Sequence, residues 1–148
     1  MRKTLLLLSA LFLTLTISGC EQESKTAVSE VHWDRDMCAR CVMVVSDRMN
    51  TVQVKNPDTG KKYIFDDIGC MILWFKDENI TWQDRAVIWV TDNSTGKWID
   101  ARKAFYDTHN VTPMAYGFCA HADKDSIEDA KEVVRYEEVV KRVIAIGK

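Results

Sequence analysis

The chain has 148 residues, 47% of them hydrophobic, and its 20 basic and 22 acidic residues leave a formal net charge of −2. This length suits a single domain of ordinary size. There is no basic patch, ribonucleoprotein motif, zinc-finger spacing or helix-turn-helix pattern, so nucleic acid is excluded as the expected partner. The slightly negative net charge fits a cation carrier but does not distinguish between functions, because acidic proteins are common.

The chain begins with a predicted targeting segment. Arg2 and Lys3 precede an apolar run from Leu5 to Ile17, which has the length of a signal-peptide core and is short for a membrane span. The run ends in Ser18-Gly19-Cys20, and small residues before a cysteine resemble the bacterial lipobox. We therefore predict cleavage before Cys20 and lipidation of its thiol, with two or more acyl chains giving a stable anchor. The alternative is an ordinary secretory signal followed by a chance cysteine.

Lipidation predicts a location in the cell envelope, facing the periplasm. Glu21, rather than Asp, follows the cysteine, which favours the outer membrane over the inner one if the host is Gram-negative. No second apolar run is long enough to span a bilayer. We divide the chain into a signal peptide (1–19), a lipidated N-terminus with a flexible polar tether (20–33) and one folded domain (34–148).

Two similar segments predict related β-β-α units. In the first, strands at 51–55 and 61–65 flank the turn 56–60, and Asp67 begins a helix over 68–76. In the second, strands at 86–91 and 97–99 flank the turn 92–96, and Asp100 begins a helix over 101–108. The expected fold class is therefore α+β.

The C-terminal part predicts three further elements. Ser126 resembles a helix cap, with an acidic residue three positions later, and predicts a helix to about Glu132. A strand is expected at 133–136. A final helix is expected over 137–145, with its valines on one side.

The first chemical motif is Cys38-Ala39-Arg40-Cys41, followed by Met43. Two thiols separated by two residues can converge on one ion, and a nearby thioether can join them. Thiolates and thioethers are soft donors that select Cu(I) over hard cations. The same spacing also fits a redox pair, a structural disulfide or half of a zinc site. No second such pair and no closely spaced pair of histidines completes a zinc site.

The second motif is Phe65-Asp66-Asp67-Ile68-Gly69-Cys70-Met71. If Asp67 caps the helix, Cys70 lies in its first turn, where the helix N-terminus favours a thiolate. Gly69 would allow another segment or a ligand to approach the backbone. Residue type alone favours Cys70 as a core residue, and leaves Met71 open between core and ligand.

The third motif contains Thr112-Pro113-Met114 and ends in Cys119-Ala120-His121. Met114 follows a proline in a non-helical stretch, so a core-helix role does not explain it. His121 is a possible additional metal ligand, although a lone histidine is more often a surface or core residue. Enzyme motifs are missing: there is no GxSxG, HExxH or phosphate loop, and no enzyme is expected.

Together these motifs resemble the NosL family, lipoproteins that serve as copper chaperones for nitrous oxide reductase. The resemblance extends over about residues 36–134 and includes the lipobox cysteine, Trp98-Ile99-Asp100-Ala101 and the motifs above. It implies a fold of two β-β-α units similar to the organomercurial lyase core. It also implies Cu(I) binding, a role in denitrification, and delivery to a recipient cuproenzyme or an ABC-type maturation complex.

Two positions depart from the family pattern. Val42 stands where the family usually has glycine after the second cysteine, which restricts the backbone before Met43. His121 stands where the family usually has phenylalanine, so it is either an added ligand or a simple substitution.

The sequence thus predicts an envelope lipoprotein that binds Cu(I) through Cys38, Cys41, Met43 and Met114, with Met71 as a further candidate. Two rival functions remain open. One is a thiol–disulfide oxidoreductase using Cys38 and Cys41. The other is an interaction lipoprotein in which Cys38–Cys41 and Cys70–Cys119 are disulfides.

Overall fold

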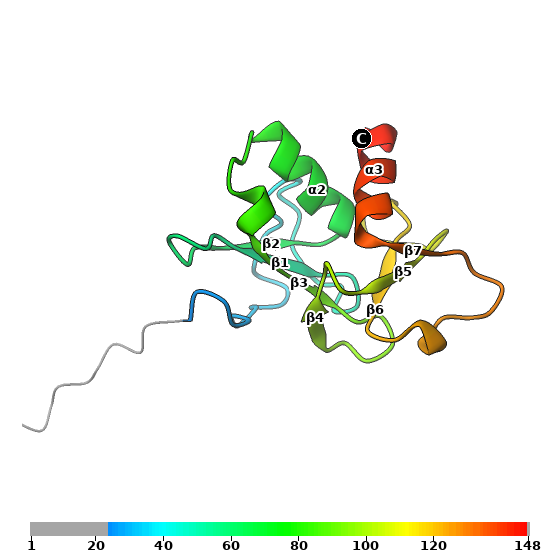
Figure 1. The fold of residues 1–148 in the computed structure, drawn as a ribbon. Coiled ribbons are helices and arrows are strands. Elements are labelled where there is room, and N and C mark those ends of the chain that lie inside the picture. The colour runs from blue at the N-terminus through cyan, green and yellow to red at the C-terminus, as the bar shows by residue number, and fades with distance from the viewer. Residues whose placement is uncertain (1–23, 148) are drawn as a thin grey trace, which may run out of the picture.

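Two antiparallel sheets and two α-helices make up residues 24–147, the part of the chain that the computed structural model describes (Figure 1). The predicted α+β class is confirmed. The predicted signal peptide and lipidation at Cys20 fall outside the described residues. Within residues 24–147, neither helix is long and apolar enough to cross a membrane.

The larger sheet joins the two predicted hairpins side by side. β1 pairs with β2 on one edge and with β3 on the other, which gives the order β2-β1-β3-β4. Both hairpins turn through a glycine at positive φ, Gly60 at 77° and Gly96 at 70°, a conformation that few other residues adopt cheaply. The four strands are β1 (Val52–Lys55), β2 (Lys62–Phe65), β3 (Val87–Thr91) and β4 (Trp98–Asp100).

Helix α2 (Ile68–Asp77) begins where predicted, with Asp67 as its N-cap. Its residues 68–75 are all buried, which is unusual for an amphipathic helix. The reason is its position: α2 packs against β1 and β2 on one side and against the second helix, α3, on the other (Figure 1). The start of α2 is therefore held rigidly at the end of β2.

The helix predicted over 101–108 does not form. Residues 101–103 make a single turn, and the next residues form strand β5 (Phe105–Asp107). The segment is too short for a stable isolated helix, and Phe105 and Tyr106 are aromatic residues that favour strands. The second of the two predicted units consequently lacks its helix. Similarity to the organomercurial lyase core stays a prediction.

A second, three-stranded sheet has the order β6-β5-β7. The predicted helix over 126–132 is wrong, because only a short 3-10 turn, Lys124–Ser126, forms before an irregular segment. This segment is polar and has no apolar face to bury. The predicted strand near 133 and the C-terminal helix are confirmed. The elements are β6 (Cys119–His121), β7 (Val133–Arg135) and α3 (Tyr136–Ile146).

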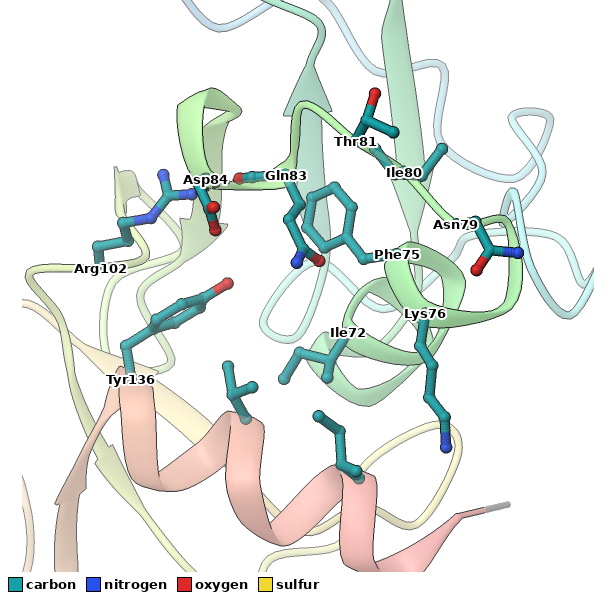
Figure 2. A pocket seen from close by; sticks show the side chains of 12 residues that line it. Ile72, Phe75, Lys76, Asn79, Ile80, Thr81, Gln83, Asp84, Arg102 and Tyr136 are labelled. Atoms are coloured by element: carbon teal, nitrogen blue, oxygen red, sulfur yellow. Dashed lines mark hydrogen bonds between the residues drawn. The ribbon is translucent and has the colours of Figure 1, made fainter.

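A groove with a volume of about 710 Å³ opens between α2 and α3. Figure 2 shows its apolar floor, to which Ile72 and Phe75 contribute from α2 and Tyr136 from the start of α3. Arg102 lies on its rim and donates hydrogen bonds to the backbone oxygens of Ala86 and Gln83. None of the lining residues is a cysteine, methionine or histidine, so this groove offers no soft metal ligand.

The second half of the predicted tether lies against the larger sheet. The buried side chain of Gln53 accepts a hydrogen bond from the Ser29 backbone N–H at 2.7 Å and donates one to the Ser29 carbonyl at 3.0 Å. The Trp89 indole donates to the Thr26 carbonyl at 2.9 Å. These bonds fix residues 24–31 to β1 and β3 from early in the described chain.

Candidate metal centre

The Cys38–Cys41 loop is a tight turn fastened to the edge of the larger sheet. Its ends are joined by a β-bridge between Met37 and Val44 and by a hydrogen bond from the Cys38 N–H to the Met43 carbonyl at 2.8 Å. The Ala39 N–H donates to the carbonyl of Ile64 in β2, also at 2.8 Å. The last bond places the loop beside the end of β2, next to the second motif.

The second motif supplies the opposite side of the site. Asp66 follows directly after β2, Asp67 caps α2, and Cys70 occupies the first turn of that helix. The hydrogen bond between Ala39 and β2 therefore brings the loop thiols to the same place as Asp66 and Cys70.

Four donor atoms converge there. The sulfurs of Cys38, Cys41 and Cys70 and a carboxylate oxygen of Asp66 all lie within 4.8 Å of one another. Cys38, Cys70 and Asp66 are buried, whereas Cys41 is half-buried and forms the accessible side. The Cys41 thiol donates to the Asp66 carboxylate at 3.4 Å. We call these four residues the thiol cluster.

The three thiols are electrostatically unequal. A hydrogen bond from Cys70 stabilises the Cys38 thiolate and lowers the pKa of Cys38 to about 6. The same interaction, together with burial, raises the pKa of Cys70 well above its usual range. Burial raises the pKa of Cys41 to about 11. At neutral pH the cluster therefore holds one thiolate and two thiols, and a cation that binds all three sulfurs must displace two protons.

The adjacent acids Asp66 and Asp67 have separate roles. Asp66 faces the thiols. Asp67 accepts hydrogen bonds from the N–H of Gly69 at 2.9 Å, the hydroxyl of Thr112 at 2.6 Å and the N–H of Met114 at 3.2 Å. Burial raises the pKa of Asp67, although these donors oppose the shift. Asp67 thus ties the helix start to the third motif.

Gly69 is needed because Tyr116, from the third motif, packs directly against its backbone. A Cβ on Gly69 would lie 2.1 Å from the Tyr116 ring, so no side chain fits there. The close approach expected at this glycine is therefore made by the chain's own Tyr116. The Tyr116 hydroxyl in turn lies 3.4 Å from the guanidinium of Arg40, a residue that stands between Cys38 and Cys41 in the sequence. All three motifs consequently meet around the start of α2.

The predicted methionine ligands occupy three different environments. Met43 is 53% exposed and lies opposite Cys38 in the loop. Met114 is half-buried beside Asp67. Met71 is completely buried within α2. Their roles as ligands stay predictions.

His121 lies away from the thiol cluster, on β6. Its Nδ1 is 3.1 Å from the Ser94 hydroxyl and 3.2 Å from that of Ser126. Its Nε2 is 3.4 Å from a carboxylate oxygen of Asp107, without hydrogen-bond geometry. Lys131 donates to the other oxygen of Asp107 at 2.9 Å. We call this group the His121 junction.

Sequence reasoning missed Asp66 and undervalued Cys70. Cys70 is buried, as expected of a core residue, yet its sulfur faces two other thiols. Asp66 gave no local signal, because two consecutive acids are usual at a helix start. The spacing of Cys70 from the helix cap was the one available clue, since a first-turn thiol can point past the helix end.

Three sulfurs and one carboxylate fit a soft or borderline cation. Thiolates bind Cu(I) and Zn²⁺, whereas hard cations such as Mg²⁺ and Ca²⁺ require oxygen ligands. The residues of the thiol cluster can therefore hold a metal ion, and its asymmetric burial leaves Cys41 accessible for exchange.

Comparison with known proteins supports the fold. The sequence matches no protein-family model and no curated protein. Among solved structures, the crystal structure of the copper chaperone NosL from Shewanella denitrificans is similar, with a TM-score of 0.62 and 14% sequence identity. The match covers 76% of this chain and 95% of that chain. The chain therefore has a NosL-like α+β fold with a candidate metal centre.

Proposed function

We propose that this chain is a Cu(I) carrier of the cell envelope rather than an enzyme. The observation that carries the proposal is the convergence of Cys38, Cys41 and Cys70 with Asp66 within 4.8 Å. The NosL-like fold supports it, because the similar structure is that of a copper chaperone. Copper is the cargo in this proposal, and the thiols are the groups that hold and release it.

The geometry suits transfer rather than permanent storage. A three-sulfur site leaves Cu(I) with few ligands, so that a partner's ligand can add before one of the carrier's ligands leaves. Cys41 is the accessible thiol, and the exposed Met43 follows it in the same loop. We propose that Met43 and Met114 add thioether ligands to the bound Cu(I) and keep hold of it during exchange, when it leaves the buried thiols.

The anchor and the recipient follow from the motif resemblance. We propose that Cys20 is lipidated and holds the protein on the periplasmic face of a membrane, the outer one if the host is Gram-negative. The recipient would be nitrous oxide reductase or a related cuproenzyme, reached directly or through an ABC-type maturation complex. Growth on nitrous oxide, compared between a deletion strain and its complemented form, tests this recipient.

An anaerobic Cu(I) titration against a chelator tests the metal proposal. The reduced mature chain should bind one Cu(I), and a moderate excess of Zn²⁺ should not displace it. Binding of Zn²⁺ in preference to Cu(I), or no competition with the chelator, would overturn the proposal. Met114→Ala should weaken Cu(I) binding even after mild oxidation, because a thioether does not form a disulfide.

The pKa difference between Cys38 and Cys41 also fits a thiol–disulfide oxidoreductase, the second candidate function. Low pKa of one cysteine in such a pair is typical of redox enzymes. Cys38 is only 2% exposed, however, and attack on a substrate disulfide requires an accessible thiolate. Metal-free turnover of a dithiol substrate would favour the redox function, and its absence would favour the carrier.

A further inference from the structure

We infer that Asn79 is an N-glycosylation site, modified in the periplasm by a membrane oligosaccharyltransferase. The inference rests on the cell-envelope location proposed above, because bacterial enzymes of this class act on exported chains. It adds a modification site to the domain, at the opposite end of α2 from the thiol cluster.

Three asparagines of the chain carry a threonine two residues later, the spacing that N-glycosylation requires when the middle residue is not proline. Bacterial oligosaccharyltransferases also recognise an acidic side chain two residues before the asparagine. Asn79 has such an acid, Asp77, whereas the other two asparagines have a threonine at that position. The three motifs are Asn79-Ile80-Thr81, Asn93-Ser94-Thr95 and Asn110-Val111-Thr112.

The fold holds the other two motifs in structural contacts. The Asn110 amide nitrogen donates to Asp107 at 2.7 Å, and its oxygen accepts from Lys131, also at 2.7 Å. The Thr112 hydroxyl of the same motif is buried and donates to a carboxylate at 2.6 Å. Asn93 is half-buried, and its N–H donates to a β6 carbonyl at 2.7 Å. An acceptor must present its amide and the hydroxyl to the enzyme together, so neither motif is available in the folded domain.

Asn79 is presented on an exposed turn. It follows the C-cap of α2 directly, and its φ of 49° is the left-handed conformation in which asparagine often ends a helix. The side chains of Asn79 and Thr81 are exposed, and neither makes a hydrogen bond within residues 24–147. Figure 2 shows both residues at one end of the groove between α2 and α3. The helix end accounts for the asparagine, but it does not require an exposed threonine two residues later.

Asp77 completes the motif at the last position of α2. Its side chain is 48% exposed and pairs with Arg40 at 2.9 Å. A partly exposed ion pair of this kind is weak, so a cation of the enzyme can replace Arg40 during the reaction. The Asn79 amide nitrogen then forms a bond to the anomeric carbon of a lipid-linked oligosaccharide, and the bond from that carbon to pyrophosphate breaks. The lipid pyrophosphate leaves, and the amide proton passes to a base of the enzyme.

The length of α2 keeps the glycan away from the metal centre. Cys70 lies in the first turn of the helix, and Asp77 ends it seven residues later, about 10 Å along the helix axis. Asn79 lies beyond that end. Chelator competition should therefore give the same Cu(I) affinity for the glycosylated and the unmodified protein.

Mass spectrometry of the full-length chain tests the site. The chain is expressed in a bacterium that carries a periplasmic oligosaccharyltransferase of acidic-residue specificity and its lipid-linked oligosaccharide. The mature protein should gain one glycan, on Asn79. Asn79→Gly should lose it without straining the left-handed turn, because glycine adopts this conformation readily. Thr81→Val and Asp77→Asn should lose it too, and the matched Asn93→Gln variant should keep it.

Three results would overturn the site: an unmodified Asn79 beside a modified reference glycoprotein in the same cells, a glycan that Asp77→Asn retains, or a glycan on Asn93 or Asn110. The mass of the N-terminus separates this inference from the proposals above. A chain that has lost residues 1–19 but carries no glycan would refute the modification alone, whereas a chain that keeps them would refute the envelope location and the modification together. Failure of the parent to bind Cu(I) would remove the copper proposal and leave the glycosylation site standing.

Discussion

The thiol cluster and the His121 junction both contain buried side chains that can bind a metal ion, but these side chains have different hydrogen-bond partners. In the thiol cluster, three sulfurs and a carboxylate face one another and depend mostly on weak thiol hydrogen bonds. In the His121 junction, Nδ1 is next to two serine hydroxyls, and Lys131 neutralises the Asp107 carboxylate. The donor atoms of the thiol cluster converge on one point. The polar atoms of the His121 junction are instead bonded to one another, and they connect the turn 92–96, β5, β6 and the segment 124–131.

The difference shows that residue type alone does not identify a metal ligand. A buried cysteine such as Cys119 donates to the Asn50 side chain at 3.3 Å, and burial raises its pKa to about 12. Cys70 is equally buried but faces a thiolate. Substitutions in the two groups should therefore separate metal affinity from stability.

The largest expected effect comes from comparing Cys70→Ala with Cys119→Ala. Loss of a residue that merely supports a ligand lowers metal affinity about 10- to 100-fold, so loss of the Cys70 sulfur should lower Cu(I) affinity at least about 100-fold. Cys119→Ala removes an equally buried thiol outside the cluster and should leave the affinity unchanged. Chelator competition measures both. Equal affinities for the two variants would show that Cys70 is only a core residue.

Cys70→Ala should also change the acidity of Cys38. Above pH 6 the metal-free parent should show one thiolate, since the Cys70 hydrogen bond lowers the Cys38 pKa to about 6. Without that donor, the Cys38 pKa should rise toward its ordinary value, because the Cys70 hydrogen bond is the largest cause of its lowering. Ultraviolet thiolate absorbance, followed with pH, measures the shift, and Cys41 does not interfere because its pKa is about 11. An unchanged midpoint in the variant would mean that Cys70 does not donate to Cys38.

The neighbouring acids provide the next comparison. Asp66→Ala should weaken metal binding about tenfold with little change in stability, because Asp66 faces the thiols. Asp67→Ala should lower the free energy of unfolding by about 2–3 kcal/mol, since it removes a helix cap and two further hydrogen bonds. Denaturant titration and chelator competition on both variants distinguish the roles. If Asp66→Ala lowered the stability and Asp67→Ala weakened metal binding, the roles of the two acids would be reversed.

His121→Ala should affect stability rather than metal binding. Removing the buried imidazole leaves a cavity and ends its contacts with the Ser94 and Ser126 hydroxyls, at a cost of about 1–3 kcal/mol. Cu(I) affinity should stay within a factor of two or so of the parent, which is below about 0.5 kcal/mol. A large loss of affinity with unchanged unfolding would instead identify His121 as an additional ligand.

The smallest expected effect concerns Val42. Its φ of 62° is left-handed, where a β-branched residue is strained, and its side chain is 62% exposed. Val42→Gly should therefore raise the free energy of unfolding by about 1 kcal/mol. Val44→Gly, in the bridged position opposite Met37, should lower it. Thermal unfolding of the two variants checks the signs, and destabilisation by Val42→Gly would contradict the strain.

Sequence patterns predicted the elements whose signals are local. The hairpin turns contain glycines that adopt positive φ, and Asp67 caps α2 as its position suggested. The segment 101–108 was misassigned because tertiary pairing of Phe105 and Tyr106 overrides a plausible helix cap at Asp100. The α+β class and the Cys38–Cys41 pair were thus accessible from sequence, whereas the second helix of the repeat was not.

The complete site could not be predicted because it depends on a long-range contact. The hydrogen bond from Ala39 to Ile64 joins the loop to β2, and no local pattern announces it. This contact, together with the Arg40–Asp77 ion pair at 2.9 Å, places Cys38 and Cys41 opposite Asp66 and Cys70. Val42 likewise has a left-handed backbone although it is not glycine, because the ends of its loop are fixed on both sides.

X-ray absorption of the Cu(I)-loaded protein tests the central claim most directly, because it counts the sulfur atoms bound to copper. The parent and Cys119→Ala should show the same sulfur count, at least three, and Cys70→Ala should show one fewer. That result would establish that thiols from the loop and from α2 bind one ion together. A parent with only two sulfurs, or a count unchanged in Cys70→Ala, would contradict the thiol cluster as the copper site.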